Sequence, residues 1–355
     1  MISEQLSANS ERCAVPLVEV TRGPLVESRH HGHIVAVEPD GSVVAFAGAP
    51  ETITYMRSSA KLHQAIPLIA SGAADRFGFT EKEIALACAS HSGEPMHTEI
   101  VASMLRKLQL PIDALKCGTH EPYSAEVARQ LRDRGEKPNV LQNNCSGKHA
   151  AMLALALHLG APIETYDQPQ NPVQVAIKRC VSQFAAVCEE EIAVGIDGCG
   201  VPVFGLSLSA MALMCARLIA PPREFDAATR DARRRIVSAV MANPELIGGT
   251  TDRLDTELMS AASGRLFSKV GAEGVYIVGV LPCKEWPKGF GLALKIEDGD
   301  DQRARPTVVI EALRQLGVLG NESLAAISRY RSFPVRNRRG DQVGEVKASF
   351  ELKYT

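Results

Sequence analysis

Arg57-Ser58-Ser59-Ala60-Lys61 marks the point where the sequence pattern changes from strand-like to helical. Before this stretch, apolar runs at residues 33–37 and 43–47 flank the turn Pro39-Asp40-Gly41, a pattern typical of a β-hairpin. After it, as far as residue 159, apolar residues recur with helical spacing. A serine and a lysine three residues apart therefore stand at the junction between a predicted sheet and a predicted helical block.

Strand-like segments return in the second half of the chain, at residues 192–196, 275–280 and 291–296 and near the C-terminus. The pattern predicts an α/β sandwich whose antiparallel sheet is built from both ends of the chain, with a helical subdomain inserted. We place the sandwich domain at residues 1–57 and 160–355. The mainly helical subdomain, which contributes to the active site, is placed at residues 58–159.

Composition excludes several classes of protein. The 355 residues are 45% hydrophobic and 23% charged, with a net charge of -2, which argues against nucleic acid or an anionic membrane as a partner. No apolar run approaches the roughly 18 residues that a membrane span needs. The N-terminus lacks an export pattern and the nine cysteines are an odd number, so we expect a cytoplasmic protein without a disulfide framework.

Ser58 and Lys61 suggest nucleophilic chemistry. A serine attacks a carbonyl carbon well only when a base removes its proton, and a partly buried lysine with a lowered pKa can be that base. The spacing places the two residues one helical turn apart. Ser-x-x-Lys also arises by chance, so a solvated helix start is the alternative, but serine β-lactamases carry the same pattern in this position.

Two further segments fit the same chemistry. Ser90-His91-Ser92-Gly93-Glu94 offers hydroxyl groups in a turn after an apolar helix, and Lys269-Val270-Gly271 precedes a strand. We predict a second couple of Ser90 with Lys269, against the plainer interpretation of a polar turn and a surface lysine. Arg57 is predicted to hold a substrate carboxylate, and His91 and Glu94 are predicted substrate-binding residues.

Cys145-x-x-Lys148 and Cys199 lie in turns and suggest a metal site. Zinc prefers sulfur ligands, but lysine is a rare ligand because its amine must first lose its proton, and the neighbouring His149 is the more ordinary choice. From spacing alone, two unligated cysteines are the simpler interpretation. Asp197, next to Cys199 in the same turn, is a candidate to orient a lysine or a metal-bound water.

Four segments together resemble the rhizobial-type (class 3) L-asparaginases, and the likeness runs from Leu17 to the last strand. They are Arg57-Ser58-Ser59-Ala60-Lys61, Ala89-Ser90-His91-Ser92-Gly93-Glu94, Asn143-Asn144-Cys145-Ser146-Gly147-Lys148-His149-Ala150 and Gly195-Ile196-Asp197-Gly198-Cys199-Gly200-Val201-Pro202. The resemblance implies a serine β-lactamase-like and glutaminase-like fold, a homodimer, and hydrolysis of L-asparagine to L-aspartate and ammonia.

Residue by residue, the resemblance implies one Ser–Lys couple at Ser58 and Lys61 and a second at Ser90 and Lys269. It implies zinc at Cys145, Lys148 and Cys199, which reverses the interpretation from spacing, and it matches Asp197 to an acidic residue beside the metal. We expect an acyl-enzyme mechanism with Ser58 as nucleophile and Lys61 as base, although the sequence does not decide which serine attacks. A glutaminase, another acyl-serine amidohydrolase and a non-catalytic zinc- or amino-acid-binding protein are the alternatives.

Overall fold

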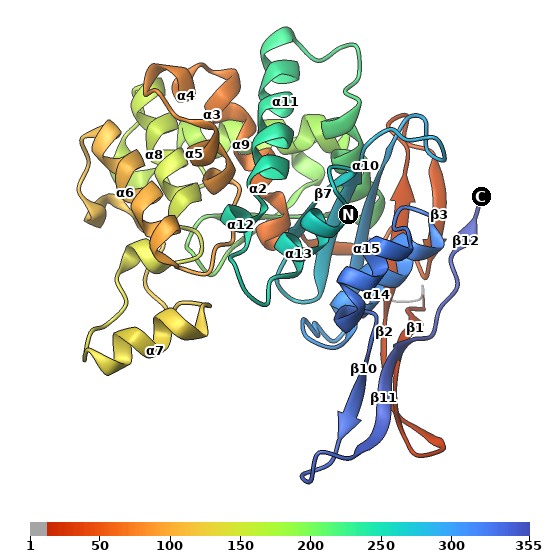
Figure 1. Ribbon diagram of the computed structural model, residues 1–355. Helices are drawn as coiled ribbons and strands as arrows, with labels where there is room; N and C mark the ends of the chain where they lie inside the picture. The colour runs from red at the N-terminus through yellow and green to blue at the C-terminus, as the bar shows by residue number, and fades with distance from the viewer. Residues whose placement is uncertain (1–12) are drawn as a thin grey trace. The chain divides into compact units, whose positions relative to one another are not determined.

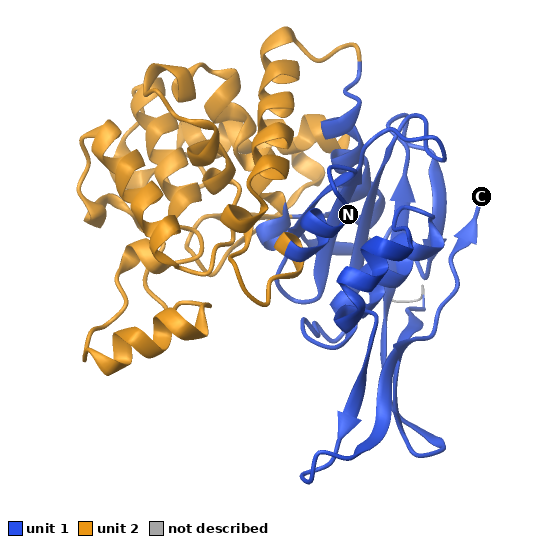
Figure 2. Cartoon of the chain, viewed as in Figure 1, with its two compact units in different colours: residues 1–59, 205–222, 257–355 blue, residues 60–204, 223–256 orange. Residues whose placement is uncertain are grey.

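The structure is a computed structural model that describes residues 13–355, so residues 1–12, on which the prediction about export rests, lie outside it. The chain forms two compact units (Figure 2). Unit 1 comprises residues 1–59, 205–222 and 257–355, and unit 2 comprises residues 60–204 and 223–256.

Unit 1 is built around an antiparallel sheet that contains strands from both ends of the chain (Figure 1). In the described residues the sheet has nine strands, in the order β10-β11-β1-β2-β9-β8-β7, with β3 pairing β2 and β12 pairing β3. Their bounds are β1 Val15–Arg22, β2 Leu25–Val37, β3 Val43–Ala47, β7 Leu266–Val270, β8 Val275–Val280, β9 Phe290–Ile296, β10 Ser332–Arg336, β11 Gln342–Ala348 and β12 Lys353–Tyr354.

The central strands of this sheet are covered on both faces. Every residue of β8 is buried, and so is all but one residue of β9, which is why both read as continuous apolar runs. Helices α10 (Leu208–Ile219) and α14 (Ala304–Gln315) pack on these strands. Gly291 permits the close approach of α10, since a Cβ atom there would lie 1.8 Å from the Ala212 carbonyl oxygen.

The predicted hairpin is confirmed in unit 1. Strands β2 and β3 pair antiparallel with Val37 opposite Val43, and the turn closes through Glu38 N–H to Ser42 O at 2.9 Å. Gly41 has φ +94°, a conformation that glycine adopts without a Cβ penalty. The turn Pro39-Asp40-Gly41 therefore sets the register that the sequence pattern indicates.

Unit 2 is mainly helical (Figure 1). Its helices are α2 Lys61–Gln64, α3 Ile66–Ala70, α4 Ala73–Arg76, α5 Glu81–Ala87, α6 Pro95–Leu108, α7 Ala125–Asp133, α8 Ser146–Leu159, α9 Pro172–Ala185, α11 Ala227–Ala242 and α12 Pro244–Ile247. Helix α8 is apolar on all sides and contacts α5, α6 and α9, so it forms the centre of the unit. Strand β5 (Ala193–Ile196) leads into the turn that carries Asp197 and Cys199.

A second, smaller sheet and two further helices complete the strands and α-helices of residues 13–355. Strand β4 (Ile53–Tyr55) pairs antiparallel with β6 (Pro202–Ser207) through Tyr55 opposite Gly205. The chain also forms α13 (Leu254–Ala261) and α15 (Asn321–Ala326). None of the helices within residues 13–355 is long and apolar enough to cross a membrane.

The observed architecture confirms the predicted fold class, a mixed α/β protein with an antiparallel sheet from both termini and a helical part. The boundaries of the compact units differ from the predicted ones at 58–159. Residues 160–204 and 223–256 also belong to the helical unit. The reason is tertiary packing, because α9 contacts α2 and α8 while α11 contacts α3 and α5.

Candidate active site and thiol cluster

Lys61 and Ser90 form a buried couple in unit 2. Lys61 is the first residue of α2 and is 1% exposed, and Ser90 follows α5 and is 3% exposed. The Lys61 Nζ atom lies 3.0 Å from Ser90 Oγ. It also donates to Ala89 O at 2.6 Å and to Asn144 O at 3.4 Å. The geometry thus joins the lysine of one predicted couple to the serine of the other.

The other members of the predicted couples lie in unit 1. Ser58 is half-buried in the short 3₁₀ helix Arg57–Ala60. Lys269 is fully buried in β7 and donates to Val270 O at 3.2 Å. Each predicted couple, Ser58 with Lys61 and Ser90 with Lys269, joins residues of different units, and both pairings stay predictions.

Arg57, immediately before Ser58, has a left-handed backbone with φ +51°. A non-glycine residue in this region is uncommon and is found more often at functional sites than elsewhere. Its guanidinium lies 3.9 Å from the Glu273 carboxylate in the same unit. The sequence pattern gives no sign of this backbone conformation.

His91 is buried beside the couple with both ring nitrogens in hydrogen bonds. Nδ1 accepts from the Gly93 N–H at 3.2 Å, so the proton is on Nε2, which donates to Ser146 Oγ at 2.9 Å. Burial lowers the pKa of His91 well below its ordinary value, and nearby positive groups lower it further. The His91 ring thus links the turn at residues 90–93 to the start of α8 and helps to hold both in position. Its contact with a substrate stays a prediction.

The segment at residues 247–253 holds the same turn from its other side. Arg253 donates to Ser90 O at 2.6 Å and to Ser92 Oγ at 2.8 Å, and the Ser90 N–H donates to Ile247 O at 2.9 Å. Glu94 accepts from Thr250 N–H at 3.0 Å and Thr250 Oγ1 at 2.9 Å. Glu94 therefore fastens this segment, which is a role the sequence does not indicate.

A second cluster of unit 2 contains the predicted metal ligands. Lys148 is 3% exposed, and its Nζ lies 3.0 Å from Cys199 Sγ. Asp197 Oδ2 lies 3.9 Å from the same sulfur. His149, the more ordinary ligand by residue type, instead shares a 2.7 Å hydrogen bond with Tyr166 Oη through Nδ1. Of these two neighbours on α8, Lys148 is the one that faces the thiol.

The thiols of Cys145 and Cys199 are hydrogen-bonded to each other. The hydrogen bond from Cys199, with the charges of Lys61 and Lys148, holds the pKa of Cys145 well below its ordinary range. The same hydrogen bond to Cys145 raises the pKa of Cys199. Burial alone would lower the pKa of Lys148, but the attraction of the cysteine sulfurs outweighs burial and its net pKa is raised. These surroundings therefore favour a thiolate at Cys145 and an ammonium group at Lys148.

Two thiols and an amine within hydrogen-bond reach of one another have the donor chemistry of a zinc site. No group of three or more His, Cys, Asp or Glu side chains suited to a metal ion occurs within residues 13–355. A zinc ion at this cluster would consequently need Lys148 as its third protein ligand. With Lys148 as a ligand beside Cys145 and Cys199, the side chains present fit a zinc ion.

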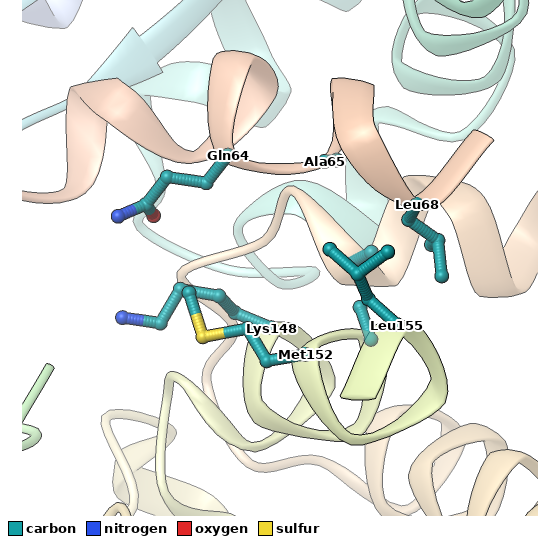
Figure 3. A pocket seen from close by; sticks show the side chains of 8 residues that line it. Gln64, Ala65, Leu68, Lys148, Met152 and Leu155 are labelled. Atoms are coloured by element: carbon teal, nitrogen blue, oxygen red, sulfur yellow. The ribbon is translucent and has the colours of Figure 1, made fainter. Parts of the chain in front are cut away.

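A small cavity lies beside Lys148 (Figure 3). Its volume is about 10 Å³, close to the minimum for one water molecule, so it cannot admit an amino acid. The polar ends of Gln64 and Lys148 point to one side in Figure 3, while Leu68 and Leu155 form the apolar side.

Several residues around the Lys61–Ser90 couple were not predicted, among them Asn144, His120 and Arg253. Asn144 stands inside the segment that contains Cys145, but its contribution is a carbonyl oxygen that any residue would offer. Arg253 is 163 positions from Ser90, and no local spacing connects them. His120 precedes an exposed tyrosine in a loop without periodicity.

Comparison with known proteins identifies one family. The model of the L-asparaginase II family matches residues 18–348. No match to a curated protein was found. Among solved structures, a probable glutaminase from Bacillus subtilis complexed with 6-diazo-5-oxo-L-norleucine is 14% identical, with a TM-score of 0.40 over 81% of this chain and 85% of that chain. The Bacillus subtilis glutaminase YbgJ in covalent complex with 5-oxo-L-norleucine is 14% identical, with a TM-score of 0.41 over 90% and 96%.

Proposed function

The chain belongs to the L-asparaginase II family, an amidohydrolase family, and we propose that it hydrolyses L-asparagine to L-aspartate and ammonia. The proposed chemistry is acyl transfer through a serine activated by lysine. The observation that supports it best is the 3.0 Å contact of Lys61 Nζ with Ser90 Oγ in a buried setting. A hydroxyl and an amine in this arrangement can exchange a proton without water between them.

Ser58 is the nucleophile in this proposal. Its half-buried side chain is more accessible than that of Ser90, which is 3% exposed and already contacts Lys61. The Ser58 oxygen attacks the side-chain amide carbon of asparagine while its proton passes to Lys61. The tetrahedral intermediate then expels ammonia, whose nitrogen takes the proton back from Lys61, and water hydrolyses the ester to release aspartate and restore the Ser58 hydroxyl group. Backbone N–H groups near Ser58 would stabilise the oxyanion by about 3 kcal/mol each.

Lys61 is suited to accept a proton when it is a neutral amine. Ala89 O and Asn144 O lie within hydrogen-bond reach of its nitrogen, and so does the Ser90 hydroxyl group. Ser90 would then relay protons between Lys61 and the reacting groups. Lys269 is the proposed second lysine of this relay.

Cys145, Lys148 and Cys199 would hold a zinc ion, with Asp197 beside it. When bound, zinc would supply a positive charge and a Lewis acid in place of the protons that the two thiols and the amine carry. These three side chains tie the start of α8 to the turn after β5, so the proposed ion stabilises unit 2.

The substrate contacts are proposed for Arg57, His91, Glu94 and Asp197. Arg57 is the best candidate to bind the α-carboxylate, because a guanidinium can donate two parallel hydrogen bonds to it. Selectivity for asparagine over glutamine depends on one methylene group, worth roughly 1–3 kcal/mol in a fitted pocket. We also propose that the protein is cytoplasmic and forms a homodimer. Light scattering of the purified protein measures its molar mass and tests the dimer.

Substitution of the two serines tests the mechanism. Ser58→Ala is expected to abolish ammonia release from L-asparagine while the circular dichroism spectrum is unchanged. Ser90→Ala should lower kcat by about 10²–10⁴-fold, the usual contribution of a positioned proton-transfer group. Ser71→Ala is the control, because Ser71 is an exposed serine of unit 2 that bonds only its local backbone. Near-normal activity of Ser58→Ala would sink this mechanism.

Two alternatives make different measurable claims. A glutaminase or a β-lactam hydrolase would show a higher kcat/KM on L-glutamine or on a chromogenic β-lactam than on L-asparagine. A non-catalytic zinc- or amino-acid-binding protein would contain metal or bind asparagine in calorimetry without releasing ammonia from any amide.

A further inference from the structure

The Lys61–Ser90 couple is part of a closed circuit of residue contacts within unit 2. From Ser90 the circuit runs through Arg253, Tyr123, His120 and Asn144 and back to Lys61. The first step is the 2.6 Å hydrogen bond from Arg253 to Ser90 O, and the last is the 3.4 Å contact of Lys61 Nζ with Asn144 O. Tyr123 is the member farthest from the couple in this sequence of contacts.

Within this circuit of contacts, the aromatic ring of Tyr123 contacts Arg253 on one side and His120 on the other. The Arg253 guanidinium lies 5.6 Å from the centre of the Tyr123 ring, within the range of a cation–π contact. On the other side, the His120 ring stacks on it with centroids 5.0 Å apart and an interplanar angle of 27°. Tyr123 is nevertheless 59% exposed, so its place is set by these contacts and by its neighbours in the chain rather than by burial.

His120 transmits the position of Tyr123 to Asn144. Its Nδ1 lies 2.7 Å from the Glu121 carbonyl oxygen, which only accepts, so Nδ1 carries the proton. Its Nε2 then accepts the Asn144 N–H at 3.0 Å. The same residue presents its carbonyl oxygen to Lys61, and a shift of His120 would move that oxygen relative to the amine.

Arg253 transmits the position of Tyr123 to Ser90. It donates to Ser90 O and to Ser92 Oγ, and Ser92 Oγ in turn donates to Gly248 O at 3.0 Å. Arginine presents its donors in a rigid planar fork, so a contact that holds the guanidinium in place also fixes the direction of both hydrogen bonds. Loss of the Tyr123 side chain would remove one contact of the Arg253 guanidinium and loosen its hydrogen bond to the Ser90 carbonyl oxygen.

We propose that Tyr123 is a positioning residue that keeps Lys61 and Ser90 at proton-transfer distance by fixing Arg253 on one side and His120 on the other. This inference rests on the proposed function, because it assigns a purpose to the Lys61–Ser90 contact. Tyr123 touches neither member of the couple in this circuit of contacts and acts through the residues between. Proton transfer is sensitive to displacements well below 1 Å, so a surface aromatic ring can influence it from this distance.

The test compares Tyr123→Ala with Tyr123→Phe in the full chain. Tyr123→Ala should lower kcat for L-asparagine about 5- to 10-fold, the scale of one cation–π and one stacking contact, with KM changed less than about twofold. Tyr123→Phe keeps the aromatic ring and should restore most of kcat. Tyr354→Ala removes a tyrosine of equal exposure, 58%, from unit 1 and serves as the control.

The outcomes separate this inference from the proposed function. A rise in KM with unchanged kcat, or no difference between Tyr123→Ala and wild type, would overturn the positioning role. If wild type itself releases no ammonia, the proposed function fails, and hydrogen exchange of residues 89–94 and 248–254 decides the inference alone. Faster exchange in Tyr123→Ala than in Tyr123→Phe supports the ring as a structural clamp on Ser90, and equal exchange refutes it.

A double substitution checks the route through Arg253. Arg253→Lys keeps the charge but lacks the planar fork, so it should lower kcat by itself. If Tyr123 acts through Arg253, adding Tyr123→Ala to Arg253→Lys should lower kcat by clearly less than the product of the two single effects. Fully multiplicative effects would show that Tyr123 acts independently of Arg253 and would contradict the proposed route.

Discussion

Two lysines of unit 2, Lys61 and Lys148, are almost equally buried and yet have neighbours of different chemistry. Lys61 contacts three oxygen atoms, those of Ala89, Ser90 and Asn144, and also the Cys145 thiol, whereas Lys148 contacts the sulfur of Cys199. Carbonyl and hydroxyl oxygens are compatible with a neutral amine, while thiolates favour an ammonium group or a shared metal ion. We therefore propose the lysine with mostly oxygen neighbours, Lys61, as the proton acceptor and the lysine beside Cys199, Lys148, as the metal ligand.

The two environments meet at Cys145. Its thiol is influenced by the charges of both lysines and is hydrogen-bonded to Lys61 as well as to Cys199. A positive ion bound to the Cys145 sulfur would offset the negative charge of that sulfur near Lys61. The proposed zinc ion would thus help to separate the roles of the two lysines.

The largest expected difference between the lysines is in catalysis. Lys61→Met removes the proton acceptor with little change in volume and should lower kcat on L-asparagine by about 10²–10⁴-fold. Steady-state ammonia release measures this effect, and the far-ultraviolet circular dichroism spectrum checks the fold. Metal content of Lys61→Met should equal that of wild type, and a variant that loses its zinc together with its activity would break the distinction between the two sites.

The next expected difference is in metal binding and stability. Lys148→Met removes one of three proposed ligands and the cation nearest the Cys199 sulfur, so bound zinc should fall to trace levels. Breaking a buried charged pair usually lowers the free energy of unfolding by about 3–5 kcal/mol. Elemental analysis and urea denaturation measure the two effects. Full zinc occupancy in Lys148→Met would rule this lysine out as a ligand.

A smaller expected effect is a dependence of the free energy of unfolding on pH. It comes from two buried histidines of unit 2, His91 and His97. Burial lowers the pKa of His91 and of His97, so both rings stay neutral in the fold when the unfolded chain has begun to bind protons. Their contribution to stability is complete above about pH 6.5 and is lost as the pH falls below it, by up to about 1.4 kcal/mol per pH unit for each group.

Denaturation at pH 7.5 and pH 5.5 measures this dependence. The free energy of unfolding of wild type should be lower at pH 5.5, and the difference should shrink in His97→Gln. His31→Gln removes an exposed histidine of unit 1 and should leave the difference unchanged. Equal stability of wild type at the two pH values would contradict the assignment of neutral buried rings.

The sequence predicts local features of this fold well where the determinants are neighbours in the chain. Thr80 and Glu83, three residues apart, form the reciprocal cap of α5, and Gly41 closes the predicted hairpin. The antiparallel sheet with strands from both termini follows from the positions of the apolar runs. The extent of the helical unit does not, because α9 and α11 join it only through packing against α2 and α3.

The site shows the same division. Lys61, Ser90, Cys145, Lys148 and Cys199 all lie in motifs that the sequence singles out, and the structure brings them together in unit 2. The contact of Lys61 with Ser90 was not predicted, since the two residues are 29 positions apart and meet only when α2 and the end of α5 are packed. Arg253 and Tyr123 escape sequence reasoning for the same reason, as their partners lie far along the chain or in an irregular loop.

The most direct test is ammonia release from L-asparagine, with L-glutamine in parallel, by wild type, Lys61→Met and Lys148→Met, each before and after a strong chelator. The account predicts release from asparagine by wild type, almost none by Lys61→Met, and residual release by Lys148→Met that the chelator does not lower further. No release by wild type, or equal release by wild type and Lys61→Met, would contradict the claim that this lysine activates a serine in an asparagine-hydrolysing site.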